Sequence, residues 1–221
     1  QLYLAGAIMG GAIAMLFMAQ PEAASVTGSV LLAPAIWNMG LGVQAPLAVM
    51  ATLFPDHEVT GRELPGHIVA GDSLPAMIRL YYDPLTLHAT RFDTLRGLVG
   101  LMNEAAHAAP GVRGPILCLY GDRDQIVPPA AIGHLWQVTR GVVRRDLVPG
   151  GYHLLLRSRS AVRTEADIAA WILNPSGFMP SGGESAASAW MAAGFAWRDR
   201  AGSGGEALPW FLPARIDTLA R

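Results

Sequence analysis

The chain has 221 residues, of which 52% are hydrophobic and only 15% are charged, against about 25% charged residues in an average soluble domain. Its 16 basic and 17 acidic side chains give a formal net charge of −1, which excludes a nucleic-acid or anionic-lipid binder that acts through bulk positive charge. Cys118 is the only cysteine, so an intramolecular disulfide and a multi-cysteine zinc site are both excluded. The composition describes an apolar chain that is long enough to bury a core.

The first segment of the chain is an uncharged apolar run over residues 2–19. About 18 such residues are the lower limit for a membrane span, and Gly6 and Gly10 have the spacing that lets two membrane helices approach closely. The run also divides into a short buried strand over residues 2–4 and an apolar helix over residues 9–20, with glycines at the junction. Both interpretations are open at this point.

Downstream, short apolar runs alternate with helix-forming segments. Residues 29–34 and 115–120 are continuous apolar runs, typical of strands that are buried on both faces of a parallel sheet. Residues 142–148 form a third predicted strand, which is followed by a Pro-Gly-Gly loop. The predicted helices lie at residues 47–53, 74–82 and about 90–106, after residues 128–129, and at residues 161–173.

The alternation of strands and helices predicts an α/β fold with a parallel sheet. Residues 1–35 and 111–173 form its predicted core, and residues 36–110 are predicted to be a helical lid inserted over the sheet. Residues 174–221 are rich in Gly, Ser and Ala, and we expect a partly disordered tail there. The alternative is that aromatic side chains of the tail cover an apolar surface or touch lipid. These side chains are Trp190, Phe195, Trp197, Trp210 and Phe211.

Three strand ends carry chemically suggestive residues at the sheet edge where ligands of α/β proteins gather. The segment 6–11, Gly-Ala-Ile-Met-Gly-Gly, has the glycine spacing of a sharp turn from a strand into a helix. Asp124 follows the second predicted strand, and His153 lies in the loop after the third. Each signal is weak alone, because an Asp in such a sequence is more often a turn former. Together, in the order turn, acid, histidine, they fit an acid–histidine relay.

In these segments the chain resembles the α/β-hydrolase superfamily, specifically its lysophospholipase and monoacylglycerol lipase-like branch with the serine aminopeptidase S33-type domain. The resemblance covers about residues 2–173. It implies hydrolysis of carboxylic esters by Ser-His-Asp acyl-transfer chemistry, beneath a helical lid and without a cofactor or metal. The matching segments are residues 10–14 (GGAIA), 31–35 (LLAPA), 82–85 (YDPL), 119–124 (LYGDRD) and 149–153 (PGGYH).

The resemblance also implies roles for single positions. His153 is the expected general base, Asp124 is the acid that orients it, and the backbone N–H of Met9 is one oxyanion donor. The apex of the turn, where the family carries its nucleophilic Ser, is Ile8. A sec-butyl side chain has no proton for a base to remove and no lone pair to attack a carbonyl. We therefore expect little or no hydrolysis by this chain.

A second departure from the family concerns the front of the domain. The resemblance begins at the strand before Ile8, so we expect the chain to be the C-terminal portion of a longer hydrolase, with the N-terminal strands and the second oxyanion donor absent. The first strand would then expose one hydrophobic edge, and such an edge can pair with another chain.

Neither the cysteine nor the remaining histidines are expected to replace the missing nucleophile. Cys118 lies in the middle of a predicted buried strand, where a free thiol behaves as an inert hydrophobe. The remaining histidines lack the spacing of metal ligands, and we expect them to lie on the surface or in packing positions. They are His57, His67, His88, His107 and His134.

Three functional hypotheses follow from the sequence. The first is a protein similar to hydrolases of monoacylglycerols and lysophospholipids, made inactive by Ile8 and the absent front. The second is a pseudo-hydrolase that binds an acyl ligand without turnover. The third is a membrane-anchored protein that uses residues 2–19. The expected ligand is a small ester or acyl lipid rather than nucleic acid, and the expected location is the cytoplasm, with peripheral membrane contact as an alternative.

Overall fold

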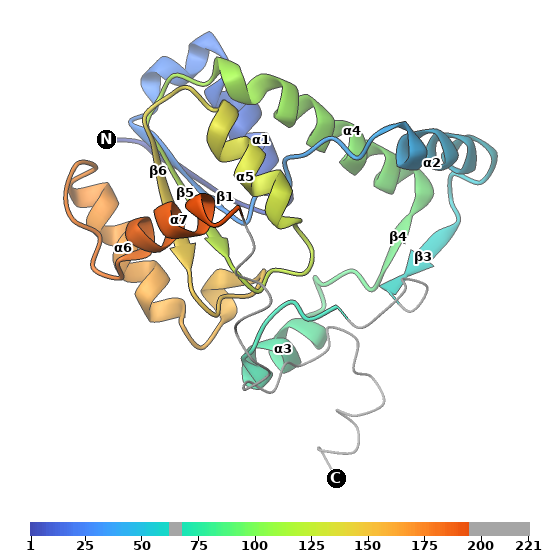
Figure 1. Cartoon of the computed structure of the whole chain (residues 1–221). Helices are drawn as coiled ribbons and strands as arrows, with labels where there is room; N and C mark the ends of the chain where they lie inside the picture. Colours follow the sequence, from blue (N-terminus) through green and yellow to red (C-terminus); the bar gives the residue numbers. More distant parts are fainter. Residues whose placement is uncertain (62–67, 195–221) are drawn as a thin grey trace.

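The computed structural model describes residues 1–61 and 68–194. Its centre is a four-stranded parallel sheet of order β1-β2-β5-β6 (Figure 1). Every residue of β2 and β5 is buried, which explains why both strands read as continuous apolar runs in the sequence. The strands are β1 (Tyr3–Ala7), β2 (Gly28–Leu32), β5 (Ile116–Gly121) and β6 (Val143–Val148).

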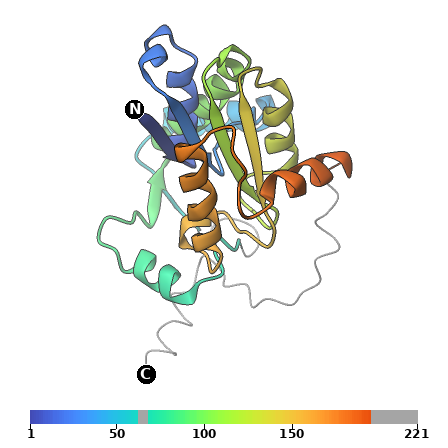
Figure 2. The same cartoon turned by 90° about the vertical axis from the view of Figure 1, so that its left-hand side faces the viewer.

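Helices cover both faces of this sheet, and the alternating side chains of β5 contribute to both cores. Cys118 and Tyr120 belong to a core that includes residues of α1, α4 and α5, whereas Leu117 and Leu119 pack in a second core that includes Trp171 of α6. Figure 2 shows α5 and α6 on opposite sides of the strands. These helices are α1 (Met9–Met18), α4 (Phe92–Ala108), α5 (Pro129–Val138) and α6 (Ala161–Leu173).

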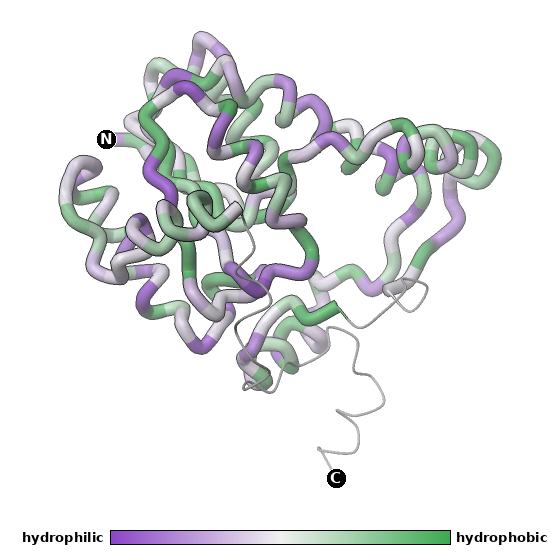
Figure 3. The backbone as a smooth tube through the Cα atoms, in the orientation of Figure 1, coloured by the Kyte–Doolittle hydropathy of each residue, from purple (hydrophilic) through white to green (hydrophobic). Residues whose placement is uncertain are grey.

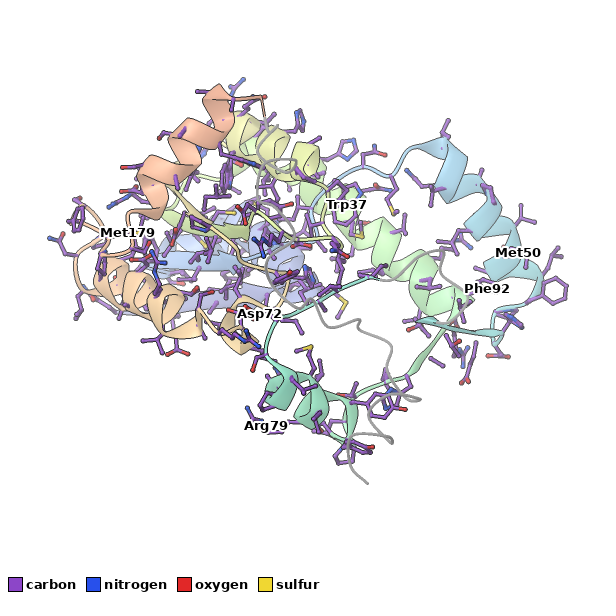
Figure 4. All side chains as sticks on the ribbon, turned by 60° about the horizontal axis from the view of Figure 1, so that its bottom comes forward. Trp37, Met50, Asp72, Arg79, Phe92 and Met179 are labelled. Atoms are coloured by element: carbon purple, nitrogen blue, oxygen red, sulfur yellow. The ribbon has the colours of Figure 1, made fainter. Side chains whose placement is uncertain are left out.

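The segment between β2 and β5 extends away from the sheet, apart from its long helix α4. Helix α2 packs against α4 at the right of Figure 1, far from the sheet. Helix α3 lies apart from both, at the bottom of Figure 1 (see also Figure 4). A short antiparallel pair, β3 with β4, joins these parts and was not predicted, because strands of three residues carry too little pattern. The elements are α2 (Leu41–Leu53), β3 (Glu58–Thr60), α3 (Leu74–Tyr81) and β4 (Ala89–Arg91).

The uncharged run at the start of the chain is not one helix. It forms strand β1, which ends at Ala7, and helix α1, which begins at Met9. Interpreting residues 2–19 as a membrane span is therefore wrong. Across residues 1–61 and 68–194, none of the helices combines the length and the apolar character that crossing a membrane requires.

Strand β1 lies at one edge of the sheet formed by the described residues, with β2 as its neighbour. Its side chains are less buried than those of β2, and Leu2 beside it is 59% exposed. An edge strand presents N–H and C=O groups to which a further strand can bind. Pairing of this edge with another chain stays a prediction.

The C-terminal segment differs from the expected irregular tail. Helix α7 (Gly183–Ala192) packs against β6, and Trp190 is buried beside the rings of Tyr120 and Trp136. An Ala-rich stretch favours a helix, and the aromatic ring supplies its apolar anchor. Trp190 thus covers an apolar surface, as the alternative interpretation predicted. The other aromatic residues of the tail lie outside the described residues; they are Phe195, Trp197, Trp210 and Phe211.

Candidate active site

Ile8 is the single residue between strand β1 and helix α1. Its φ of 55° and ψ of −115° lie in a region that a β-branched side chain rarely adopts, and such a conformation costs on the order of 1–3 kcal/mol. Its N–H donates to the carbonyl of Leu32 at 3.0 Å, and its own carbonyl accepts from the N–H of Ala35 at 2.9 Å. The end of β2 therefore fixes the turn through the backbone, without using the side chain of Ile8.

The glycines of this turn are required by close backbone approach. A Cβ at Gly6 would lie 2.2 Å from the carbonyl oxygen of Gly10, and a Cβ at Gly11 would lie 2.7 Å from the Cβ of Pro34. Met9 begins α1, so its N–H belongs to the first helical turn, whose donors have no acceptor within the helix. The expected sharp turn is therefore present, and the role of the Met9 N–H as an oxyanion donor stays a prediction.

Asp124 and His153 form a buried hydrogen-bonded pair. The distance from Nδ1 of His153 to Oδ2 of Asp124 is 2.8 Å, and the residues are 4% and 0% exposed. The other carboxylate oxygen, Oδ1, accepts hydrogen bonds from the N–H groups of Ile126 and Val127 at 2.8 and 2.9 Å. An imidazole that donates from Nδ1 to a carboxylate carries its lone pair on Nε2. The pair therefore has the geometry of an oriented general base.

The register of the sheet brings the turn and this pair to the same edge. Ala7 of β1 lies opposite Leu32 of β2, Leu32 opposite Leu119 of β5, and the end of β5 opposite the end of β6. The three strands followed by Ile8, Asp124 and His153 are parallel, so these residues all lie beyond the carboxyl ends. This is the edge at which α/β proteins bind their ligands.

The loops that carry Asp124 and His153 are also bound to one another. Oδ1 of Asp122 accepts from the N–H of Gly150 at 2.6 Å, and the N–H of Arg123 donates to the carbonyl of Gly151 at 2.9 Å. Burial raises the pKa of the Asp122 carboxyl above its ordinary value. Sequence reasoning missed Asp122, because its partner is a backbone N–H. Its position directly after strand β5 was the available signal.

Residues 69–72, on the way into helix α3, lie along these same loops. The N–H of Val69 donates to Oε1 of Gln125 at 2.9 Å, and the carboxylate of Asp72 accepts from the N–H of Arg159, also at 2.9 Å. Figure 4 shows Asp72 where α3 meets the rest of the molecule. The inserted segment is therefore hydrogen-bonded to the acid loop and close to the histidine loop, and sequence reasoning gave Gln125 no role.

The structure offers no substitute nucleophile at Cys118. Its thiol is buried, and desolvation raises its pKa to about 12, so it carries no thiolate near neutral pH. Residues 1–61 and 68–194 contain no group of three or more metal-ligating side chains. His57 stacks on Phe92, and His107 bonds the carbonyl of Asn103. His88 packs beside Tyr81, His134 is exposed, and His67 lies outside the described residues.

The sequence model of the family described as serine aminopeptidase, S33, matches residues 1–160. The chain belongs to this family. The likeness to α/β-hydrolases inferred from the sequence is thereby confirmed, and the parallel sheet agrees with it. Helices α6 and α7 lie beyond the matched residues.

This S33-family chain is similar to one characterised protein by sequence and to several solved structures by fold. It is 26% identical over 181 residues to a monoacylglycerol lipase of Mycolicibacterium smegmatis, covering 76% of this chain and 61% of that protein. A crystal structure of a Paleococcus ferrophilus monoacylglycerol lipase matches with a TM-score of 0.66 and 20% identity, over 79% of this chain and 68% of that one. A thermostable carboxyl esterase from Bacillus coagulans matches with a TM-score of 0.59 and 20% identity, over 77% and 64%. The structural matches show the α/β-hydrolase fold.

Proposed function

We propose that this S33-family chain is an esterase-type α/β-hydrolase domain that binds a small carboxylic ester or acyl lipid and hydrolyses it little or not at all. The observation that carries this proposal is the contrast at the edge of the sheet: the Asp124–His153 pair is complete, whereas the apex of the turn is Ile8. The monoacylglycerol lipase and carboxyl esterase among the relatives support the substrate class.

The chemical reason for the low activity lies in the side chain of Ile8. Acyl transfer requires an atom with a lone pair at the apex, whose proton His153 removes while the Met9 N–H stabilises the oxyanion. A hydrocarbon provides neither the lone pair nor the proton. Losing the nucleophile of such a triad removes about 10⁶-fold in rate, and what remains comes from binding and the oxyanion hole.

The first experiment measures reactivity and binding on the same preparation. A fluorophosphonate probe, which reacts with activated serine hydroxyls, should leave the chain unlabelled. Titration with a medium-chain monoacylglycerol below its critical micelle concentration should show saturable binding. Labelling at any residue would refute the loss of the nucleophile, and an absence of saturable binding would refute the ligand-binding function.

We also propose that helix α2 contacts a lipid surface. The segment from Leu41 to Phe54 has no charged residue, yet Leu41, Leu53 and Phe54 are all more than half exposed. Figure 3 shows an apolar arm where α2 projects from the molecule. Among the described residues α4 packs on one side of the helix, and exposed apolar side chains lie on the rest of its circumference. A helix of this kind is typical of an interface with lipid.

Sedimentation with phosphatidylcholine vesicles tests this contact. Leu53→Glu places a charge in the exposed apolar face and should reduce the vesicle-bound fraction several-fold, because a charged group resists entry into lipid. Leu173→Glu is the matched control, since Leu173 is 85% exposed at the end of α6, and it should bind as the wild type does. Equal loss in both variants, or no binding by the wild type, would contradict a role of α2.

A further inference from the structure

Helix α7 begins directly against a carboxyl group of the outer strand. A Cβ placed on Gly183, its first residue, would lie only 1.6 Å from Oδ1 of Asp146 in β6, so only glycine fits there. The helix packs against β6 and runs at a steep angle to the strand (Figure 2). Gly183 lies beyond residues 1–160, whereas Asp146 lies opposite Leu119 of β5, two residues before the carboxyl end of β6. Neither residue belongs to the relay, so their contact needs an explanation of its own.

Asp146 is fully buried and has an unusual neighbour. Among the described residues neither of its carboxyl oxygens receives an N–H or hydroxyl donor, and the group within hydrogen-bonding reach is the carboxyl of Asp167 on α6. Asp167 is 1% exposed, and its Oδ1 accepts from the N–H of Ser181 at 2.9 Å. Two carboxylates cannot bond to each other without a proton, so one of the pair must be protonated.

The charges around the pair favour the protonated form. Burial, the neighbouring Asp167 and then Glu184 of α7 raise the pKa of Asp146 to about 7, while Arg163 of α6 lowers it. Glu184 is itself paired with Arg144 of β6, which also donates to two carbonyls in the connection between α6 and α7. The loss of the shared proton would leave two buried negative charges under the start of the helix, and among the described residues Arg163 opposes them.

We propose that Asp146 and Asp167 share one proton that fastens helix α7 to strand β6, and that loss of this proton releases the helix. Asp146 packs against Gly183, and Asp167 accepts the N–H of Ser181, so repulsion between the two carboxylates acts at the start of α7. The proton-sharing pair thus makes the docking of α7 sensitive to pH near neutrality.

The docked helix is also connected to the relay. The ring of Trp190 lies 5.5 Å from that of Tyr120, whose hydroxyl donates to the carbonyl of Val127 at 2.8 Å. The N–H of Val127 in turn donates to Oδ1 of Asp124 at 2.9 Å. Trp190 is therefore a positioning residue, because it backs the side chain that fixes the loop around Asp124. Release of α7 removes this support and alters the environment of His153.

The direction of the pH effect follows from the two states of Asp146. When α7 is released, the carboxyl is hydrated and titrates near its ordinary value, whereas in the docked state its pKa is about 7. Between these values the docked state binds the extra proton, so docking weakens as the pH rises through this window and then stays constant. The equilibrium for docking should fall by roughly 100- to 1,000-fold across the window.

Amide hydrogen exchange of the full chain, corrected for the intrinsic effect of pH, measures this release. In the wild type, protection of the amides of α7 should fall as the pH rises through the window, while β5 stays protected. Asp146→Asn replaces the carboxyl with an amide that donates to Asp167 at every pH, so its α7 should stay protected throughout. Glu165→Gln is the matched control: it removes an exposed carboxylate from the same turn of α6 and should behave as the wild type.

Constant protection of α7 in the wild type would overturn the proposal, as would a wild-type pH dependence in Asp146→Asn. If that variant does not fold, Asp167→Asn removes the other carboxyl and makes the same prediction. The nitrogen shifts of the His153 ring provide a second readout, because they should differ between wild type and Asp146→Asn only above the window. None of these measurements involves a ligand or turnover, so their failure leaves the proposed function intact.

Discussion

The turn at Ile8 and the loops of Asp124 and His153 lie at the same edge of the sheet. The turn has the backbone conformation of a catalytic site without a reactive side chain, whereas the loops have both. The turn keeps the backbone of a nucleophile elbow, including its strained φ, without a reactive side chain. The loops keep both the backbone and the reactive groups, with a buried hydrogen bond of 2.8 Å between them. Gly6 and Gly11 thus specify the backbone geometry of the turn. At the pair, the side chains of Asp124 and His153 specify both the geometry and the chemistry.

This difference explains how the fold tolerates Ile at the apex. The hydrogen bonds that fix the turn all use backbone atoms of Ile8, so its side chain can change without loosening the elbow. At the pair the reverse is true, because removing either side chain leaves a buried polar group without its partner. We therefore expect substitutions at the apex to change chemistry, and substitutions around it to change stability.

The largest expected effect is a gain of chemistry at the apex. Ile8→Ser supplies the missing hydroxyl, and a fluorophosphonate probe should then label it about 10³-fold faster than any residue of the wild type, because the new hydroxyl stands at the sheet edge that carries the Asp124–His153 pair. Mass spectrometry of the labelled peptide locates the adduct.

The control for this experiment is the double variant Ile8→Ser/His153→Ala. It keeps the introduced hydroxyl but lacks the base, so labelling should fall by about 10²–10⁴-fold. If the single variant stays unlabelled, or if both label equally, the turn and the pair do not act on one another, and the comparison between the two regions fails.

The next effect is a loss of stability at the glycines beside the apex. Gly6→Ala places a Cβ 2.2 Å from a backbone carbonyl oxygen and should lower the free energy of unfolding by about 3 kcal/mol. Gly10→Ala is the matched control, since a Cβ at Gly10 meets no atom within 4 Å and an alanine favours the helix by about 0.5–1 kcal/mol. Urea denaturation of both variants measures the difference, and equal stabilities would show that the close approach at Gly6 is not required.

Much of the fold could be predicted because its elements carry strong local patterns. The buried runs gave β2 and β5, the periodic segment from residue 90 gave α4, and the helix predicted over residues 161–173 is α6 with the bounds that the structure has. Helix α7 was missed for a physical reason. Its buried positions, Gly183, Ala187 and Trp190, have helical spacing. Gly and Ala have too little apolar side chain to stand out as the hydrophobic face of a helix in the sequence.

The sequence predicted the part of the candidate site that is held by a hydrogen bond between two side chains, and missed the parts in which a side chain bonds to the backbone. The order of the turn, Asp124 and His153 along the chain matched a known arrangement, and the structure brings the acid and the histidine into contact. Asp122 and Gln125 were missed because they bond to the N–H groups of Gly150 and Val69. Every residue but proline has such an N–H, so the sequence gives no sign of which one will be the partner.

The smallest expected effect lies between the two loops, at Asp122, where the structure joins them through one side chain. Asp122→Ala leaves the N–H of Gly150 without its acceptor and should lower the free energy of unfolding by about 1 kcal/mol. Asp122→Asn keeps an acceptor oxygen and should stay near wild-type stability. The pKa of the native carboxyl is raised by burial, so the wild type should lose some stability as the pH rises above the ordinary carboxyl range, and the Asn variant should not. Denaturation of the three proteins below and above that range measures both effects. If Asn and Ala lose the same stability, it is the charge of Asp122 and not its acceptor oxygen that joins the acid loop to the histidine loop.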